Sequence, residues 1–67
     1  MSATLGTLMA EGVAALNEAG IENARMDVRI LLARAAGVDG GRISAWPEDE
    51  VAADKEALFR DMIARRS

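Results

Sequence analysis

The stretch that decides the fold is Ala24–Ala36, with the sequence ARMDVRILLARAA. We expect a helix here, because Asn23 is a suitable N-cap and Gly37 can take the left-handed conformation that ends a helix. Its apolar residues recur at helical spacing on two nearly opposite sides. One stripe comprises Ala24, Val28, Leu31, Leu32 and Ala35, and the other comprises Met26, Ile30 and Ala33. A helix that is apolar on two sides normally packs between neighbours, so the pattern predicts a central helix with both stripes in the core.

A helix from about Thr4 to Ala19 is predicted to precede the central one. Ser2 or Thr4 can cap its first turn, and Gly20 can end it in the left-handed conformation. Gly12 stands in the middle of the apolar stripe, where glycine costs about 1 kcal/mol relative to alanine. We interpret this glycine as the point where the backbone of a second helix approaches closely. The stripe comprises Leu5, Leu8, Met9, Gly12, Val13 and Leu16.

Two further helices are predicted after the central one. A short helix between Asp39 and Trp46 ends before Pro47, because the residue that precedes proline avoids the helical conformation. The pair Gly40-Gly41 is interpreted as a flexible turn. The last helix spans about Ala53 to Arg66. Its predicted core stripe comprises Ala52, Phe59, Met62 and Ile63, with Leu58 at the margin and Val51 just before the helix.

These segments predict an all-α fold, a small up-and-down bundle of four helices, or of five if one splits. Neighbouring helices should be antiparallel because the connections between them are short. The 67 residues suit one domain, residues 1–67, whose small size limits its stability to a few kcal/mol, about 3–5. Trp46 is expected to close the bundle by packing on a helix, because so small a core needs a large apolar residue.

The composition excludes several classes of function. The chain has no cysteine and no histidine, which excludes disulfides, the usual zinc sites and imidazole catalysis. A net charge of −3 opposes a general role in nucleic-acid binding. No stretch is apolar enough for a membrane span, and the start lacks the basic segment of a signal peptide, so we expect a cytoplasmic location. The acidic run Glu48-Asp49-Glu50 lacks the spacing and the glycine of a calcium loop.

The order of several short motifs along the chain resembles the N-terminal domain of the HemK/PrmC family, the peptide-chain release factor glutamine methyltransferases. The pattern opens with a helix that leads into a leucine, an Ala-Gly pair and an aliphatic residue, and it continues with a basic residue, an aspartate and a Leu-Leu pair. A glycine, an Arg-aliphatic pair, an acidic loop and a final basic pair follow. The matching residues are Leu16, Ala19-Gly20, Ile21, Arg25, Asp27, Leu31-Leu32, Gly37, Arg42-Ile43, Pro47-Glu48-Asp49 and Arg65-Arg66. The chain departs from the pattern at Ala24, where many members carry proline, and at Val28, where they carry alanine.

The resemblance implies a role in recognising a protein substrate. In this family the N-terminal domain helps to dock a class I release factor, so that the glutamine of its Gly-Gly-Gln loop reaches the methyl donor. The glycine-rich loop for S-adenosylmethionine and the Asn-Pro-Pro-Tyr motif of the family's catalytic domain do not occur in this sequence. The chain would therefore bind no cofactor and would act without catalysis of its own. Its expected partners are the release factor and a C-terminal methyltransferase domain, and we expect a monomer that binds no nucleic acid directly.

Four residues are candidates for contact with the partner: Arg25, Arg29, Arg42 and Trp46. Arg25 and Arg29 stand one turn apart on an edge of the central helix, where they suit an acidic partner surface, although a solvated helix face is the simpler interpretation. Trp46 suits an interface anchor as well as the core position given above. Met26 and Ile30 are assigned to the core, and the alternative is an exposed patch that docks on the catalytic domain.

Two other functions stay open from the sequence alone. One is a stand-alone module for protein interaction or dimerisation that has no link to methylation. The other is a DNA-binding domain of the helix-turn-helix type, against which the net acidity and the lack of a basic recognition helix argue.

Overall fold

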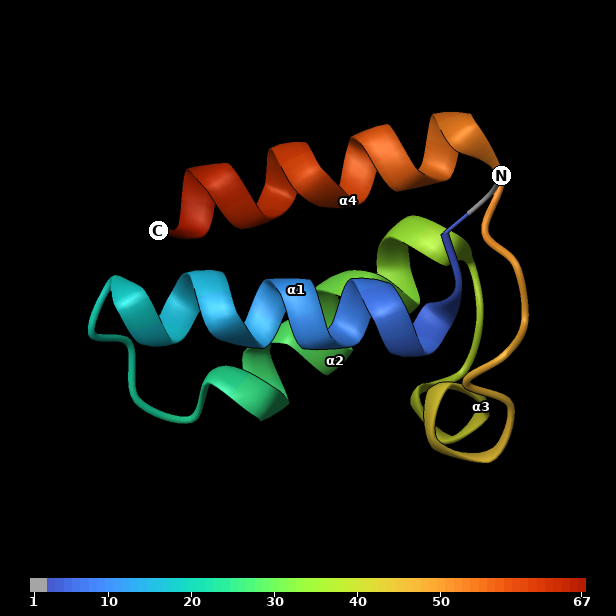
Figure 1. The fold of residues 1–67 in the computed structure, drawn as a ribbon, viewed down its shortest axis with the longest axis horizontal. Coiled ribbons are helices and arrows are strands. Elements are labelled where there is room, and N and C mark those ends of the chain that lie inside the picture. Colours follow the sequence, from blue (N-terminus) through green and yellow to red (C-terminus); the bar gives the residue numbers. More distant parts are fainter. Residues whose placement is uncertain (1–2) are drawn as a thin grey trace.

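The computed structural model describes residues 3–67, which form four helices. They are α1 (Leu5–Glu18), α2 (Ala24–Ala36), α3 (Gly40–Ala45) and α4 (Ala53–Arg66). Figure 1 shows α2 running antiparallel to both α1 and α4, while α3 lies at the end of the bundle where α1 begins. As a result α1 and α4 point in the same direction. The prediction of an all-α bundle is confirmed, with four helices rather than five.

The start of α1 is held by its own cap and by the segment that precedes α4. Thr4 is the N-cap, and its hydroxyl accepts a hydrogen bond from the amide of Thr7 at 3.2 Å. The amides of Leu5 and Gly6 donate to the carbonyls of Asp49 and Pro47, at 2.9 and 2.8 Å. First-turn amides have no partner inside a helix, so these bonds satisfy groups that would otherwise need water. Ser2, the other predicted cap, lies outside the described residues.

The boundaries of α2 match the sequence, but its N-cap works differently from the expectation. Asn23 adopts a left-handed conformation with φ of 58°, and its side chain makes no capping hydrogen bond. Its backbone carbonyl instead accepts from the amides of Met26 and Asp27, both at 3.1 Å. At the other end Gly37, with φ of 71°, ends the helix as predicted.

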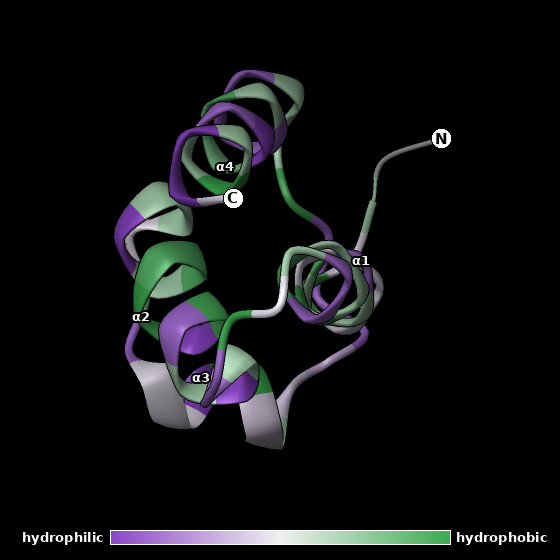
Figure 2. Cartoon of the chain, turned by 90° about the vertical axis from the view of Figure 1, so that its left-hand side faces the viewer, coloured by the Kyte–Doolittle hydropathy of each residue, from purple (hydrophilic) through white to green (hydrophobic). Residues whose placement is uncertain are grey.

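The core lies where α1, α2 and α4 face one another, as the end-on view in Figure 2 shows. α2 packs on all three other helices. Phe59 of α4 is the largest of the fully buried side chains. The buried apolar residues are Leu5, Leu8, Leu16, Ala24, Val28, Leu32, Ala35, Ala36, Ile43, Val51, Phe59 and Ile63.

Gly12 is buried in α1 because two other helices press side chains against it. A Cβ at this position would lie 2.7 Å from Cγ1 of Val28 and 2.9 Å from Cζ of Phe59. Real Cβ atoms almost never come so close to a neighbour. The predicted close approach is confirmed, but the neighbours are side chains of α2 and α4 rather than the backbone of one helix.

The prediction that the second apolar stripe of α2 lies in the core is wrong for Met26 and Ile30. Met26 is 66% exposed and Ile30 is 48% exposed, while Ala33 is partly buried. α3 lies along the edge of α2 that carries Arg25 and Arg29, while the fully buried Val28 and Leu32 mark the side that packs in the core. Residues 3–67 contain no further element that could cover the opposite side.

Three smaller assignments are also wrong. Trp46 is 51% exposed, because Ile43 takes the core position of α3 and the chain turns away at Pro47. Gly40 and Gly41 are the first two residues of α3 rather than a flexible turn. Ala52 is exposed as the residue that precedes α4, and Val51 is buried in its place.

None of the helices formed by residues 3–67 has the length and apolar character needed to cross a bilayer.

Candidate functional site

Arg25 and Arg29 lie on the edge of α2 that faces α3. They line a depression of about 290 Å³ together with Ser44 and Pro47. The aliphatic stem of Arg29 lies over Gly40, where an added Cβ would be 3.4 Å from Cδ of Arg29. Neither arginine forms an ion pair with any residue from 3 to 67. Their guanidinium groups are therefore available to a carboxylate of another molecule.

The outer side of α2 combines these arginines with two exposed apolar side chains. Arg25, Met26, Arg29 and Ile30 together line a depression of about 250 Å³. Met26 and Ile30 are one helical turn apart, so their side chains lie next to each other along the helix. Positive charge and apolar surface thus occur side by side on one helix.

Arg42 and Trp46 form a separate arrangement on α3. The guanidinium of Arg42 pairs with the carboxylate of Asp49, with Nη2 at 2.7 Å and Nε at 2.9 Å from Oδ2. The same guanidinium lies 5.3 Å from the centre of the Trp46 ring, within the range of a cation–π contact. Asp49 therefore holds Arg42 in a fixed position beside an exposed indole.

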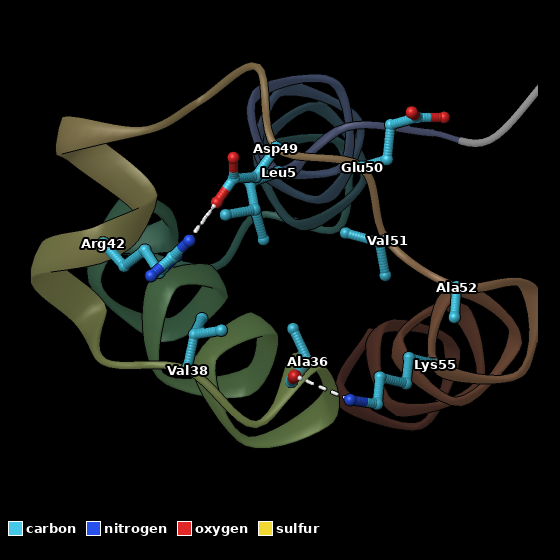
Figure 3. A pocket seen from close by; sticks show the side chains of 9 residues that line it. All are labelled: Leu5, Ala36, Val38, Arg42, Asp49, Glu50, Val51, Ala52 and Lys55. Atoms are coloured by element: carbon cyan, nitrogen blue, oxygen red, sulfur yellow. Dashed lines mark hydrogen bonds and ion pairs between the residues drawn. The ribbon is translucent and has the colours of Figure 1, made fainter.

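A cleft of about 440 Å³ opens between the end of α2, α3 and the segment before α4 (Figure 3). Leu5, Val38 and Val51 supply apolar walls. The Arg42–Asp49 ion pair lies on one side, and Lys55 of α4 lies on the other.

Most of the charged groups around this cleft form hydrogen bonds or ion pairs within the fold. The Nζ of Lys55 donates to the backbone carbonyl of Ala36 at 3.3 Å, which satisfies one of the free carbonyls at the end of α2. The carboxylate of Glu50 points away from the cleft in Figure 3. Arg42 is neutralised by Asp49. The cleft can accept an apolar side chain, while Lys55, which forms no ion pair with residues 3–67, keeps its charge at one edge.

The four predicted contact residues are all exposed, yet they form two pairs rather than one site. Arg25 and Arg29 lie beside Gly40 and Ser44 on one flank of α3. Arg42 and Trp46 line a depression on the other flank, about 490 Å³ in volume. On a helix, residues 40 and 44 share one side and residues 42 and 46 share another, which accounts for the separation.

The sequence favours the core for Met26 and Ile30, and the structure instead places them on the exposed surface, which was the alternative. The signal that points to this exposed position is the small number of helices: a helix with two apolar sides needs covering elements on both, and residues 3–67 form only two other long helices.

The acidic run contributes to folding. Asp49 pairs with Arg42, and the backbone of Asp49 and Glu50 lies along the start of α1. Within residues 3–67 no three carboxylates are grouped so that they could hold a metal ion.

The sequence pattern of the PrmC N-terminal domain family matches residues 7–67. The chain belongs to this family. Searches of curated proteins and of solved structures returned no match.

The structure of this PrmC N-terminal domain explains several residues of the shared pattern. Asp27 of α2 accepts two hydrogen bonds from Arg66 of α4, at 2.9 and 3.3 Å, and so ties the start of α2 to the end of α4. Arg65 pairs with Asp61 within α4. The Arg42–Asp49 pair joins α3 to the following segment. Arg25 is the basic residue of the pattern that has no such role inside residues 3–67.

Proposed function

We propose that this PrmC N-terminal domain recognises a class I peptide-chain release factor on behalf of a methyltransferase domain outside this chain. That domain would bind S-adenosylmethionine and methylate the glutamine of the Gly-Gly-Gln loop. The helical domain would bind a part of the release factor remote from the glutamine. Binding energy gained away from the reacting centre can orient a substrate and reduce the entropy lost on reaching the transition state.

The observation that carries this proposal is the exposed position of Arg25, Arg29, Arg42 and Trp46 on a rigid bundle. Interfaces are enriched in arginine and tryptophan. Arg42 is held by Asp49, so little conformational entropy is lost when a partner covers it. Two guanidinium groups without an internal partner, on Arg25 and Arg29, would pair with carboxylates of the release factor. Such a role places the domain in the cytoplasm, where translation ends.

Direct binding tests the proposal. Release factor from the same source is titrated into the 67-residue chain in a calorimeter, at low and at moderate ionic strength. We expect saturable one-to-one binding that weakens as salt is added, because exposed charge pairs are screened. No heat and no complex in sedimentation at either ionic strength would contradict the proposal.

Paired substitutions then separate the two flanks of α3. The double variant Arg25→Glu/Arg29→Glu tests one flank, and Arg42→Ala/Trp46→Ala tests the other. In an enzyme that carries this domain, loss of a binding contact should raise KM for the release factor and leave kcat at saturation nearly unchanged. Affinity for S-adenosylmethionine should not change in either variant.

A further inference from the structure

The basic side chains differ in whether they interact with other groups of the fold. Of eight lysines and arginines, four form ion pairs with carboxylates and Lys55 donates to a backbone carbonyl. Besides Lys55, three arginines form no ion pair with residues 3–67: Arg25, Arg29 and Arg34, all of which lie on α2. The single carboxylate of α2, on Asp27, is already paired with Arg66.

These arginines border the exposed apolar residues of the same helix. Arg34 follows Ile30 by four residues, so it lies one turn further along the same side. We define the outer face of α2 as Arg25, Met26, Arg29, Ile30 and Arg34, all of which are exposed. It carries three uncompensated positive charges on a chain whose net charge is −3. The other acidic residues belong to the remaining elements and loops.

We propose that the outer face of α2 binds an acidic amphipathic helix of the partner protein. Met26 and Ile30 form a ridge with a spacing of four residues, which suits apolar side chains at i and i+4 of a helix laid alongside. The flanking arginines would pair with carboxylates at the edges of that helix. Methionine adapts to the shape of its neighbour, which favours its use at a binding surface. This inference rests on the proposed function, because it assigns the release factor as the partner.

Charge complementarity favours this occupant over three others. A second copy related by a two-fold axis would bring arginines against arginines, and like charges oppose such a pairing. A nucleic acid would leave the apolar ridge between the arginines without a partner. Stable membrane binding generally combines a larger apolar area with several basic residues, and here the exposed ridge has two large side chains.

The size of the face limits its affinity. A helix of 13 residues is about 20 Å long, so its outer side offers a few hundred square ångströms. That is well below the roughly 800 Å² per partner of a stable interface. The face therefore contributes weak, additive binding and does not form a tight complex alone.

The test compares variants of the face with matched variants elsewhere. Met26→Ser/Ile30→Ser removes the ridge, and Arg25→Glu/Arg34→Glu reverses two of its charges. The controls are Leu58→Ser, which removes a leucine that is 49% exposed on α4, and Arg65→Glu on the same helix. All variants should keep the helical circular dichroism of the parent chain. We expect each face variant to lower the affinity for the release factor about tenfold or more, and each control to change it less than about twofold.

Mapping of the binding site distinguishes failure of this inference from failure of the proposed function. Amide shifts of the labelled chain on addition of release factor should concentrate on residues 25–34. Face variants that bind like the parent, together with shifts confined to Arg42 and Trp46, would overturn the inference and leave the proposed function intact. Absence of release-factor binding by the parent chain would overturn both.

Synthetic probes examine the chemistry of the face independently. A designed helical peptide of about 20 residues, with leucines at i and i+4 and glutamates beside them, should shift residues 25–34, while a scrambled peptide should not. Stronger effects from duplex DNA or from anionic vesicles would contradict the choice of a protein helix. Self-association of the chain would also contradict this choice if it were lost both in Met26→Ser/Ile30→Ser and in Leu58→Ser. That result would indicate that the outer face of α2 in one copy contacts α4 of another copy.

Discussion

The two sides of α2 have similar apolar residues but opposite environments. Val28 and Leu32 on the inner side are fully buried, whereas Met26 and Ile30 on the outer side are about half exposed or more. Both stripes have the helical spacing that is typical of a buried surface. The inner stripe lies in the core with α1 and α4, whereas Met26 and Ile30 of the outer stripe stay exposed on residues 3–67.

This difference shows what can be inferred from an apolar stripe on a helix. It indicates that a surface avoids water in some state of the protein, but it does not indicate which molecule covers it. Exposed apolar side chains that occur singly need no explanation, whereas a contiguous patch beside unpaired arginines is typical of an interface. The four predictions below test the contrast between covered and uncovered side chains, beginning with the largest expected effect.

The first compares the two aromatic residues of the chain, Phe59 and Trp46. Phe59→Ala should cost about 3–5 kcal/mol, because it empties the centre of the core, and so leave little folded protein. Trp46→Ala should cost about 1 kcal/mol or less, because the indole is half exposed. Urea unfolding followed by circular dichroism measures both. Equal losses would show that Trp46 is a core residue after all.

The second compares an inner with an outer residue of α2. Leu32→Ala should destabilise the domain by about 2–5 kcal/mol through loss of buried surface and the cavity that remains. Ile30→Ala should change the free energy of unfolding by roughly 0.5 kcal/mol or less. Leu31→Ala should fall between them, because Leu31 is only partly buried. A large loss for Ile30→Ala would mean that something covers the outer face in solution.

The third concerns space at two glycines. Gly12→Ala should destabilise by about 1–3 kcal/mol, because the added methyl would overlap side chains of Val28 and Phe59. The better helix propensity of alanine would offset at most about 1 kcal/mol of this. Gly41→Ala is the matched control: its Cβ would meet no atom within 4 Å, so it should stabilise α3 slightly. Thermal unfolding of both variants shows whether each substitution lowers or raises the stability of the domain.

The smallest effect is expected at the ion pair between α2 and α4. Asp27→Asn should lower stability by about 1 kcal/mol or less at low salt, because Arg66 is half exposed and solvent screens the pair. High salt should reduce the difference between variant and parent. Asp61→Asn, whose partner Arg65 lies four residues away on α4, provides the control for a pair within one helix. An equal loss in both variants would show that the pair between α2 and α4 contributes no more than a pair within one helix.

Another inter-helix pair, between Arg60 and Glu11, should be insensitive to pH in the basic range. The hydrogen bond from Arg60 to the Glu11 carboxylate raises the pKa of the arginine above its ordinary value, so the arginine stays charged in the moderately basic range.

The sequence by itself determined the local structure of the chain. The helix ends at Thr4, Gly20 and Gly37 could be predicted within a residue or two, because capping groups and left-handed glycines act over a few residues. The family could also be inferred from the ordered motifs. The crowding around Gly12 could be expected from its place in the apolar stripe, although not the identity of its neighbours.

Only the tertiary structure decided which residues belong to the surface that a partner can reach. Asp27 meets Arg66 from 39 positions away, which leaves Arg25, Arg29 and Arg34 as the unpaired charges of α2. Likewise, the contact of α1 and α4 with one side of α2 exposes Met26 and Ile30 on the other. Periodicity is a property of one helix, whereas burial and ion pairing depend on where the other helices are placed and on how few of them so short a chain can form.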